Sequence, residues 1–196
     1  MGTANSGGDR TAILRTGSVR QGGDRANKRE RLSWHGGLDL GLLVLRIVVG
    51  GTFAAHGLQH LFGWWGGPGV TRFAKTLTDL GYQHGMAFAY VTGWTEVVGG
   101  LFLVLGLLTP LAAAGVLGVI VNAIIAAKGP HGLFGANGFE YELTLAAGAF
   151  ALLFTGCGRV GLDNGRRWFR FPPAFGFLGL LVAAAASLVV LLVFRH

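Results

Sequence analysis

The segment LDLGLLVLRIVVGGTFAAHGLQHLF, residues 38–62, decides the fold class of this chain. It is almost wholly apolar, and a helix rises about 1.5 Å per residue, so the segment can cross a hydrocarbon layer of about 30 Å. It nevertheless carries Arg46 in its first half and His56, Gln59 and His60 near its end. Because ionisable groups are costly in lipid, we expect this helix to line the inside of a bundle whose other helices supply polar partners.

The composition of the whole chain also indicates a membrane protein. Of its 196 residues, 52% are hydrophobic and 13% are charged, whereas soluble domains carry about a quarter of charged residues. The 35 glycines suit helices that pack closely in lipid. The net charge of +7 is concentrated in two segments, which argues against nucleic-acid binding. The single cysteine, Cys157, leaves no cysteine pair for thiol oxidation or for a cysteine-ligated metal site within the chain.

Five apolar stretches predict an all-α polytopic membrane protein. The link Leu108-Thr109-Pro110 between the second and third stretches forces a tight antiparallel hairpin, and proline suits the first turn of a helix. Residues 70–81 have the apolar spacing of a short interfacial helix, and we expect it to act as a lid over one end of the bundle. The predicted spans lie near residues 38–62, 86–107, 111–127, 139–154 and 175–194.

The chain is predicted to have four parts: a disordered basic tail (1–36), a four-helix transmembrane core (37–157), a basic loop (158–173) and an additional transmembrane helix (174–196). Most of the 16 Lys and Arg residues lie in the tail and in the basic loop. The positive-inside rule therefore predicts a cytoplasmic N-terminus and an extracytoplasmic C-terminus.

Two charged side chains are expected deep in the membrane. Arg46 lies about 12 Å from the cytoplasmic start of the first span, and Glu96 lies about 18 Å from the same side on the antiparallel second span. An arginine side chain can bridge that difference, so we predict an ion pair between Arg46 and Glu96. The pair either fixes the helix register only, or allows Glu96 to exchange protons or polarise a bound headgroup.

A second polar set is predicted at the extracytoplasmic end of the bundle. His56 and His60 are four residues apart and share a helix face. Such a pair can hold a metal or a haem, can make hydrogen bonds at a helix end, or can bind a quinone ring and pass protons to it. We predict no metal site, no catalytic residue and no covalently bound cofactor, and quinone is the candidate ligand. The predicted quinone and proton site comprises His56, Gln59, His60, His131, Glu140 and Glu142.

Polar residues elsewhere in the spans have simpler interpretations. Asn122 interrupts an apolar run, and we expect it to form a hydrogen bond across helices. The pairs Gly50-Gly51 and Gly99-Gly100 are expected to let the first two spans approach closely. The fifth span holds only Ser187 as a polar side chain and is expected at the periphery.

Three motifs in this order resemble the DoxX family of small bacterial membrane proteins. They are LRIVVGGTFAAHGLQHLFG (45–63), TEVVGGLFLVLGLLTP (95–110) and NAIIAAKGPHGLFGANGFEYELTL (122–145). The resemblance implies a four-helix membrane core in a bacterial cytoplasmic membrane. Two positions depart from the family pattern, because the family usually has lysine at His60 and often has histidine at Lys128. The matching positions are Arg46, Gly50, His56, Gly57, Gly63, Glu96, Gly99, Gly100, Gly106, Gly132 and Glu140.

The resemblance also implies a redox setting. Members of the family resemble the membrane subunit of a thiosulfate:quinone oxidoreductase, which suggests a quinone-linked subunit of a respiratory-chain or thiol oxidoreductase complex with partner proteins. A second hypothesis is a scaffold that anchors soluble redox enzymes such as superoxide dismutase and a sulfurtransferase. A third is a carrier for a small solute or lipid, since intramembrane charges also suit transport.

Overall fold

The structure is a computed structural model that describes residues 1–2, 36–128, 132–135, 138–166 and 172–195. The chain divides into two units, Met1–His35 and Gly36–His196, and all the described helices belong to the second. Most of the predicted basic tail lies outside the described residues, as do Arg167 and Arg170 of the predicted basic loop.

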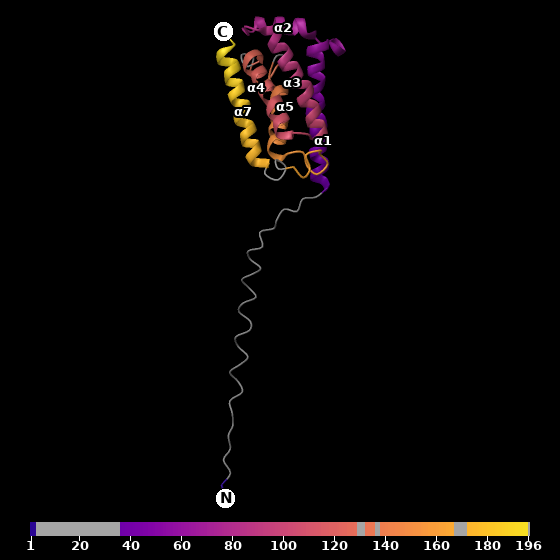
Figure 1. The fold of residues 1–196 in the computed structure, drawn as a ribbon, viewed down its shortest axis with the longest axis vertical. Coiled ribbons are helices and arrows are strands. Elements are labelled where there is room, and N and C mark those ends of the chain that lie inside the picture. The colour runs from indigo at the N-terminus through magenta and orange to yellow at the C-terminus, as the bar shows by residue number, and fades with distance from the viewer. Residues whose placement is uncertain (3–35, 129–131, 136–137, 167–171, 196) are drawn as a thin grey trace. The chain divides into compact units, whose positions relative to one another are not determined.

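The described part of the second unit is a helical bundle (Figure 1). Four of its helices are long and apolar enough to cross a membrane, within Gly36–Phe62, Gly85–Leu105, Thr109–Ala127 and Pro173–Val193. The fourth predicted span is the shorter helix α5, of 16 residues, which packs against α4 and α7. The prediction of an all-α polytopic membrane fold is therefore confirmed. In chain order the elements are α1 (Gly36–Phe62), η1 (Trp64–Gly66), α2 (Gly69–Asp79), α3 (Gly85–Leu105), α4 (Thr109–Ala123), the π-helical turn η2 (Ile124–Lys128), α5 (Glu140–Thr155) and α7 (Pro172–Val193).

Small residues set the closest packing in the bundle, between the antiparallel helices α1 and α3. A methyl group on Gly50 would lie 2.5 Å from the carbonyl oxygen of Gly100, and one on Gly57 would lie 2.6 Å from that of Gly93. The helices therefore touch backbone to backbone, as the sequence predicted for Gly50 and Gly100. The neighbouring glycines have other roles, because Gly51 faces open space and Gly99 packs against Val116 of α4.

Helix α4 occupies the centre of the bundle and packs against α3, α5 and α7. Its first half is rich in alanine, and Ala113 and Val116 are completely buried. Asn122 near its end donates a hydrogen bond from Nδ2 to Ser187 Oγ of α7 at 3.0 Å. This contact confirms the predicted cross-helix bond and fixes the position of α7.

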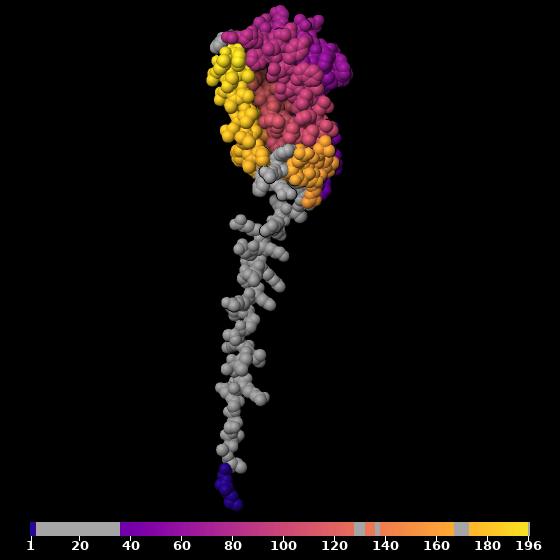
Figure 2. All heavy atoms as spheres, viewed as in Figure 1, coloured from indigo at the N-terminus to yellow at the C-terminus, as the bar shows by residue number. Residues whose placement is uncertain are grey.

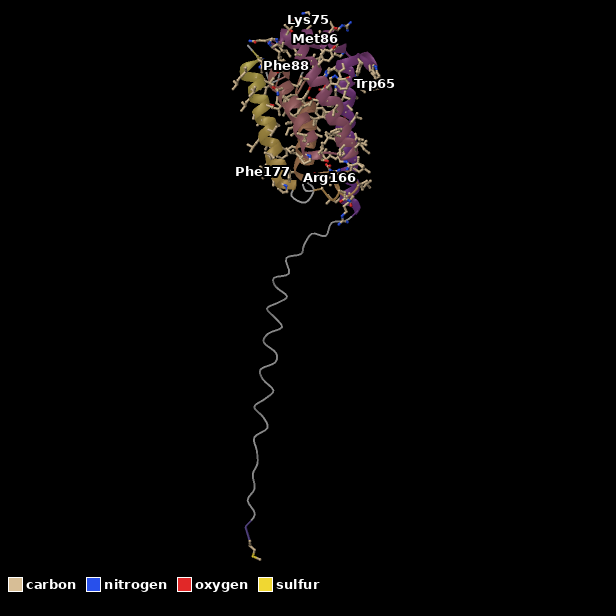
Figure 3. All side chains as sticks on the ribbon, viewed as in Figure 1. Trp65, Lys75, Met86, Phe88, Arg166 and Phe177 are labelled. Carbon is tan, nitrogen blue, oxygen red and sulfur yellow. The ribbon has the colours of Figure 1, made fainter. Side chains whose placement is uncertain are left out.

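At the end of the bundle opposite α2, the loop of residues 156–166 folds back over the helices. We call this end the loop end and the other the α2 end. Figure 3 labels Lys75 and Met86 at the α2 end, and Arg166 and Phe177 at the loop end. Asp163 is buried, and its carboxylate accepts hydrogen bonds from Leu108 N, Thr109 N and Thr109 Oγ1 at 2.7–2.9 Å. Since these amides open α4, Asp163 caps that helix from 54 residues away.

Arg46 of α1 also belongs to the loop end. Its guanidinium is buried and donates hydrogen bonds to the carbonyl oxygens of Cys157, at 2.5 Å, and Val104, at 3.2 Å. The nearby carboxylate of Asp163 adds electrostatic attraction. A carbonyl group near the end of α3 and one in the loop after α5 therefore solvate this buried charge.

The predicted ion pair between Arg46 and Glu96 is wrong. The register set by Gly50 and Gly100 places Arg46 opposite Val104, which is eight residues, or about 12 Å, from Glu96 along α3. Side chains on a helix also lean toward its N-terminus, so in antiparallel helices Arg46 leans toward the loop end and Glu96 toward the α2 end. The two charges therefore point away from each other, and Glu96 pairs with His60 instead.

Candidate functional site

A cavity of about 540 Å³ lies inside the bundle, a size typical of small-ligand sites. Helices α1, α2, α3, α4, α5 and α7 all contribute to its walls. Most of the lining is apolar, and the ionisable groups that reach it come from α1, α3 and α5. In the space-filling view the surface is hollowed between α7 (yellow) and α3 (Figure 2). The ionisable and phenolic groups of the lining are His56, His60, Tyr82, Glu96, Tyr141 and Glu142.

The central polar contact of the cavity joins α1 to α3. His60 Nδ1 lies 2.7 Å from Glu96 Oε2, within hydrogen-bond distance. The side chain of Glu96 is 7% exposed and that of His60 is 22% exposed. A carboxylate so deeply buried needs a polar partner, and the imidazole supplies it while its other nitrogen, Nε2, remains outside this bond.

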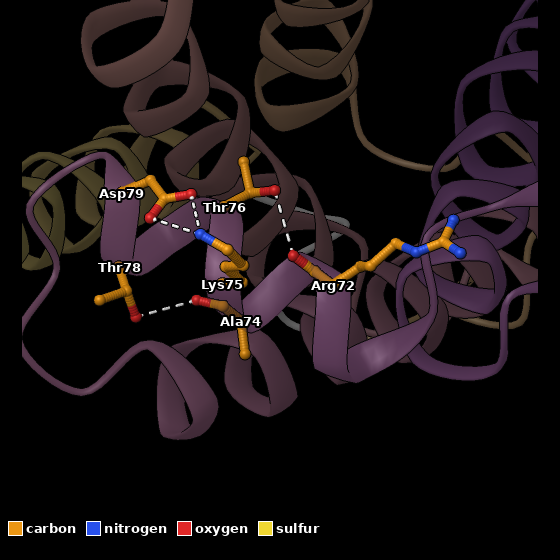
Figure 4. A network of polar contacts seen from close by, with 6 residues as sticks. All are labelled: Arg72, Ala74, Lys75, Thr76, Thr78 and Asp79. Atoms are coloured by element: carbon orange, nitrogen blue, oxygen red, sulfur yellow. Dashed lines mark hydrogen bonds and ion pairs between the residues drawn. The ribbon is translucent and has the colours of Figure 1, made fainter.

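Helix α2 covers this pair. The ring of Phe73 stacks on the ring of His60, with centroids 3.9 Å apart and planes 6° from parallel. Helix α2 is strongly amphipathic, as its sequence predicted, and its polar face carries the ion pair Lys75–Asp79 at 2.9 Å. Thr76, which also lines the cavity, donates a hydrogen bond to the Arg72 carbonyl (Figure 4). Its apolar face packs on α3 and α1. Figure 1 shows α2 lying across the end of the bundle, in the position expected for the predicted lid.

A second polar contact joins α1 to α5. His56 Nε2 lies 3.2 Å from the hydroxyl oxygen of Tyr141, within hydrogen-bond distance. The rings of His56 and His60 are 6.2 Å apart between centroids. Along the cavity wall the order is therefore Tyr141, His56, His60 and Glu96. We call these four residues the polar row. Such a row can bind the polar atoms of a ligand and can exchange protons with it.

The structure gathers part of the predicted site and separates the rest. His56, His60 and Glu142 line the cavity. Glu140 is exposed in the first turn of α5 and does not contribute to the lining, and Gln59 packs against Gly67 instead. His131 lies outside the described residues.

Three residues that line the cavity were not part of the predicted quinone and proton site. Glu96 was assigned to Arg46, while Phe73 and Tyr141 were not assigned to any site. On α5, Tyr141, Glu142 and Leu145 all line the cavity, and the one- and four-residue spacings place them on one helix face. Because Glu142 was a predicted site residue, this spacing could have identified Tyr141 from the sequence. Within the described parts of the chain, no three His, Cys, Asp or Glu side chains are grouped as ligands for a metal ion.

Comparisons with known proteins agree with the fold. Residues 41–129 match the family model of DoxX. The uncharacterized membrane protein Rv3486 of Mycobacterium tuberculosis is 33% identical over 135 residues, which cover 63% of this chain and 79% of that protein. The Bacillus subtilis protein named "Putative oxidoreductase CatD" is 30% identical over 125 residues, which cover 64% of this chain and 86% of that protein. No solved structure gives a significant match. The chain therefore belongs to the DoxX family of bacterial membrane proteins.

Proposed function

We propose that this protein is the quinone-binding membrane subunit of a redox complex whose partner subunit supplies the electrons. The cavity carries the proposal, because its walls are largely apolar and two polar pairs, an imidazole with a carboxylate and an imidazole with a phenol, lie at its α2 end. A quinone has the matching chemistry: a flat ring with two carbonyl oxygens that accept hydrogen bonds, and an apolar chain. The printed name of the Bacillus subtilis relative supports a redox role.

The polar row suits the proton chemistry of a quinone. Reduction to quinol takes up two electrons and two protons, and both protons must reach oxygens buried in an apolar cavity. Glu96 occupies Nδ1 of His60, so Nε2 is the ring nitrogen left to make a hydrogen bond to a quinone ring placed in the cavity. The hydroxyl of Tyr141 next to His56 offers a second hydrogen-bond donor.

The electrons belong to a partner in this proposal. The chain has one cysteine, and Cys157 is buried at the loop end, away from the cavity lining. A thiol in that position does not supply a dithiol donor beside the quinone. We place the α2 end on the extracytoplasmic side from the distribution of Lys and Arg, so the partner would meet the protein there.

Ligand binding to the whole chain in lipid nanodiscs tests the proposal. The probe is the fluorescent quinone-site inhibitor 2-heptyl-4-hydroxyquinoline N-oxide, titrated directly and then displaced with decylubiquinone and with a short-chain menaquinone. We expect saturable quenching in protein-loaded discs and none in empty discs. His60→Ala should weaken binding at least tenfold, because it removes a hydrogen-bond donor and leaves the carboxylate of Glu96 without its imidazole.

The matched control is Gln59→Ala. Gln59 precedes His60 on α1 but packs against Gly67 outside the cavity, so its truncation should leave the affinity unchanged. Equal quenching in loaded and empty discs would reject the proposal. Equal affinities of the two variants would reject the assigned site.

A further inference from the structure

Helix α7 forms one wall of the cavity although it lies outside the residues 41–129 matched by the family model. Val182, Ala186 and Val190 of α7 face the cavity, as do Val91 and Thr95 of α3 on the other side. The floor between them comes from small residues of α4, chiefly Ala114, Gly115 and Gly118. This part of the cavity is an apolar furrow, which we call the α3–α7 furrow.

The position of α7 is fixed along its length. At the loop end its glycines Gly176 and Gly179 pack closely against α5, and at the middle Ser187 bonds to Asn122. At the α2 end Arg195 donates hydrogen bonds to the carbonyl oxygens of Leu80, at 3.1 Å, and Ala126, at 3.4 Å. These contacts hold α7 on α4 and α5 and leave the furrow open toward α3.

The furrow opens on the side of the bundle that a bilayer would surround. Three of its lining residues are also exposed on the surface: Val91 by 61%, Leu111 by 63% and Val182 by 52%. On α4 the lining runs from Leu111 to Ala123, and these 12 steps correspond to about 18 Å of helix. The furrow is thus a long, largely apolar part of the same cavity that His56, His60, Glu96 and Tyr141 line.

We propose that the α3–α7 furrow is the portal through which a prenylated quinone enters sideways from the bilayer, and that its isoprenoid chain remains there while the ring contacts His60. The proposal rests on the proposed function and adds the class of ligand, a quinone with a chain of several isoprene units. The largely apolar walls and the small residues of the floor match a flexible methylated chain, and the few polar side chains of the lining include Thr95, Asn122 and Ser187. The isoprenoid chain extends out through the open side of the furrow, so binding of the quinone ring does not require α2 to move.

One experiment tests the effects of isoprenoid chain length and of portal width on quinone affinity. Quinones with one ring type and zero, one, two or four isoprene units are titrated into protein-loaded nanodiscs, and each affinity is corrected for the ligand's own partition into empty discs. We expect the corrected affinity to rise at least tenfold from zero to four units. Ala186→Phe narrows the portal and should abolish most of that rise, while the affinity for the quinone without a chain stays unchanged.

The neighbouring substitution Ala185→Phe is the control. Both alanines are exposed on α7, but only Ala186 lines the cavity, so both variants should fold alike and only one should respond to chain length. If neither variant changes the dependence on chain length while His60→Ala still weakens binding, the portal is refuted and the proposed function stands. If no quinone binds, both fail. A phospholipid that stays bound at saturating quinone and is released by Ala186→Phe would also refute the portal.

Discussion

His60 Nδ1 of α1 lies 2.7 Å from Glu96 Oε2 of α3, at the α2 end of the bundle. Arg46 also lies on α1, yet it is solvated by the carbonyl oxygens of Cys157 and Val104 at the opposite end. The two intramembrane charges of the family pattern therefore serve separate ends of the molecule. Glu96 lines the cavity, and Arg46 holds the loop after α5 against α3 at the loop end.

A double-mutant cycle should reproduce this division. His60→Ala and Glu96→Ala each leave one buried polar group without its partner, and the double variant removes both groups. We expect a coupling free energy of about 1–3 kcal/mol between the two positions, measured by unfolding in detergent. The contrasting cycle, Arg46→Gln with Glu96→Ala, should be additive to within about 0.5 kcal/mol because the side chains share no partner. A larger coupling in the second cycle than in the first would contradict the structure.

The contact of α1 with α3 gives a second prediction. Gly50→Ala places a methyl group against the Gly100 carbonyl and should lower the free energy of unfolding by about 1–3 kcal/mol, because neither backbone can yield easily. Gly51→Ala at the next position faces open space and should be neutral or stabilising by about 0.5–1 kcal/mol. Thermal unfolding of the two variants side by side checks this, and equal melting temperatures would contradict the close approach.

The sequence predicted features that depend on local patterns. The apolar runs predicted the membrane helices to within a few residues, and the apolar spacing of residues 70–81 predicted helix α2. The glycine pairs predicted close packing of α1 and α3, although only Gly50 and Gly100 make that particular contact. The amide of Asn122 in an apolar run predicted a bond across helices, and it makes that bond to Ser187 while it also donates to the Gly118 carbonyl of its own helix.

Features that depend on three-dimensional register were not predictable in this way. Depth counted from the ends of apolar runs placed Arg46 and Glu96 close together, but it ignored the direction in which side chains lean along antiparallel helices. Asp163 lies in a polar loop, and nothing in its neighbourhood indicates that it caps a helix 54 residues earlier. Only the packing of the loop onto the α3–α4 hairpin reveals that role.

Asp163 provides a third prediction. Asp163→Ala removes the acceptor for Leu108 N, Thr109 N and the Thr109 hydroxyl, so two amides at the start of α4 lose their partner. We expect the free energy of unfolding to fall by about 2–3 kcal/mol, because the lost bonds involve a buried carboxylate at a helix N-terminus. The control is Asn164→Ala at the exposed neighbouring position, which should change the free energy of unfolding by no more than about 0.5 kcal/mol. Similar losses in both variants would show that the loop, rather than the cap, stabilises the hairpin.

The thiol of Cys157 gives the last prediction, which concerns pH. Burial raises the pKa of Cys157 above its ordinary value, and the neighbouring carboxylate of Asp163 raises it further, against a smaller opposing effect of Arg46. Only the thiolate reacts with N-ethylmaleimide, so a raised pKa moves the onset of alkylation to higher pH, and burial slows the reaction at every pH. The reference is the variant Cys157→Ala with Val160→Cys, whose thiol occupies an exposed position of the same loop and should titrate near the usual value of about 8.5. At pH 7.5 in detergent, Cys157 should react at least about tenfold more slowly than the reference, and denaturation in SDS should remove the difference. Equal rates in the folded proteins would mean that the loop end is open and that the carbonyl of Cys157 does not hold Arg46 in the way the structure shows.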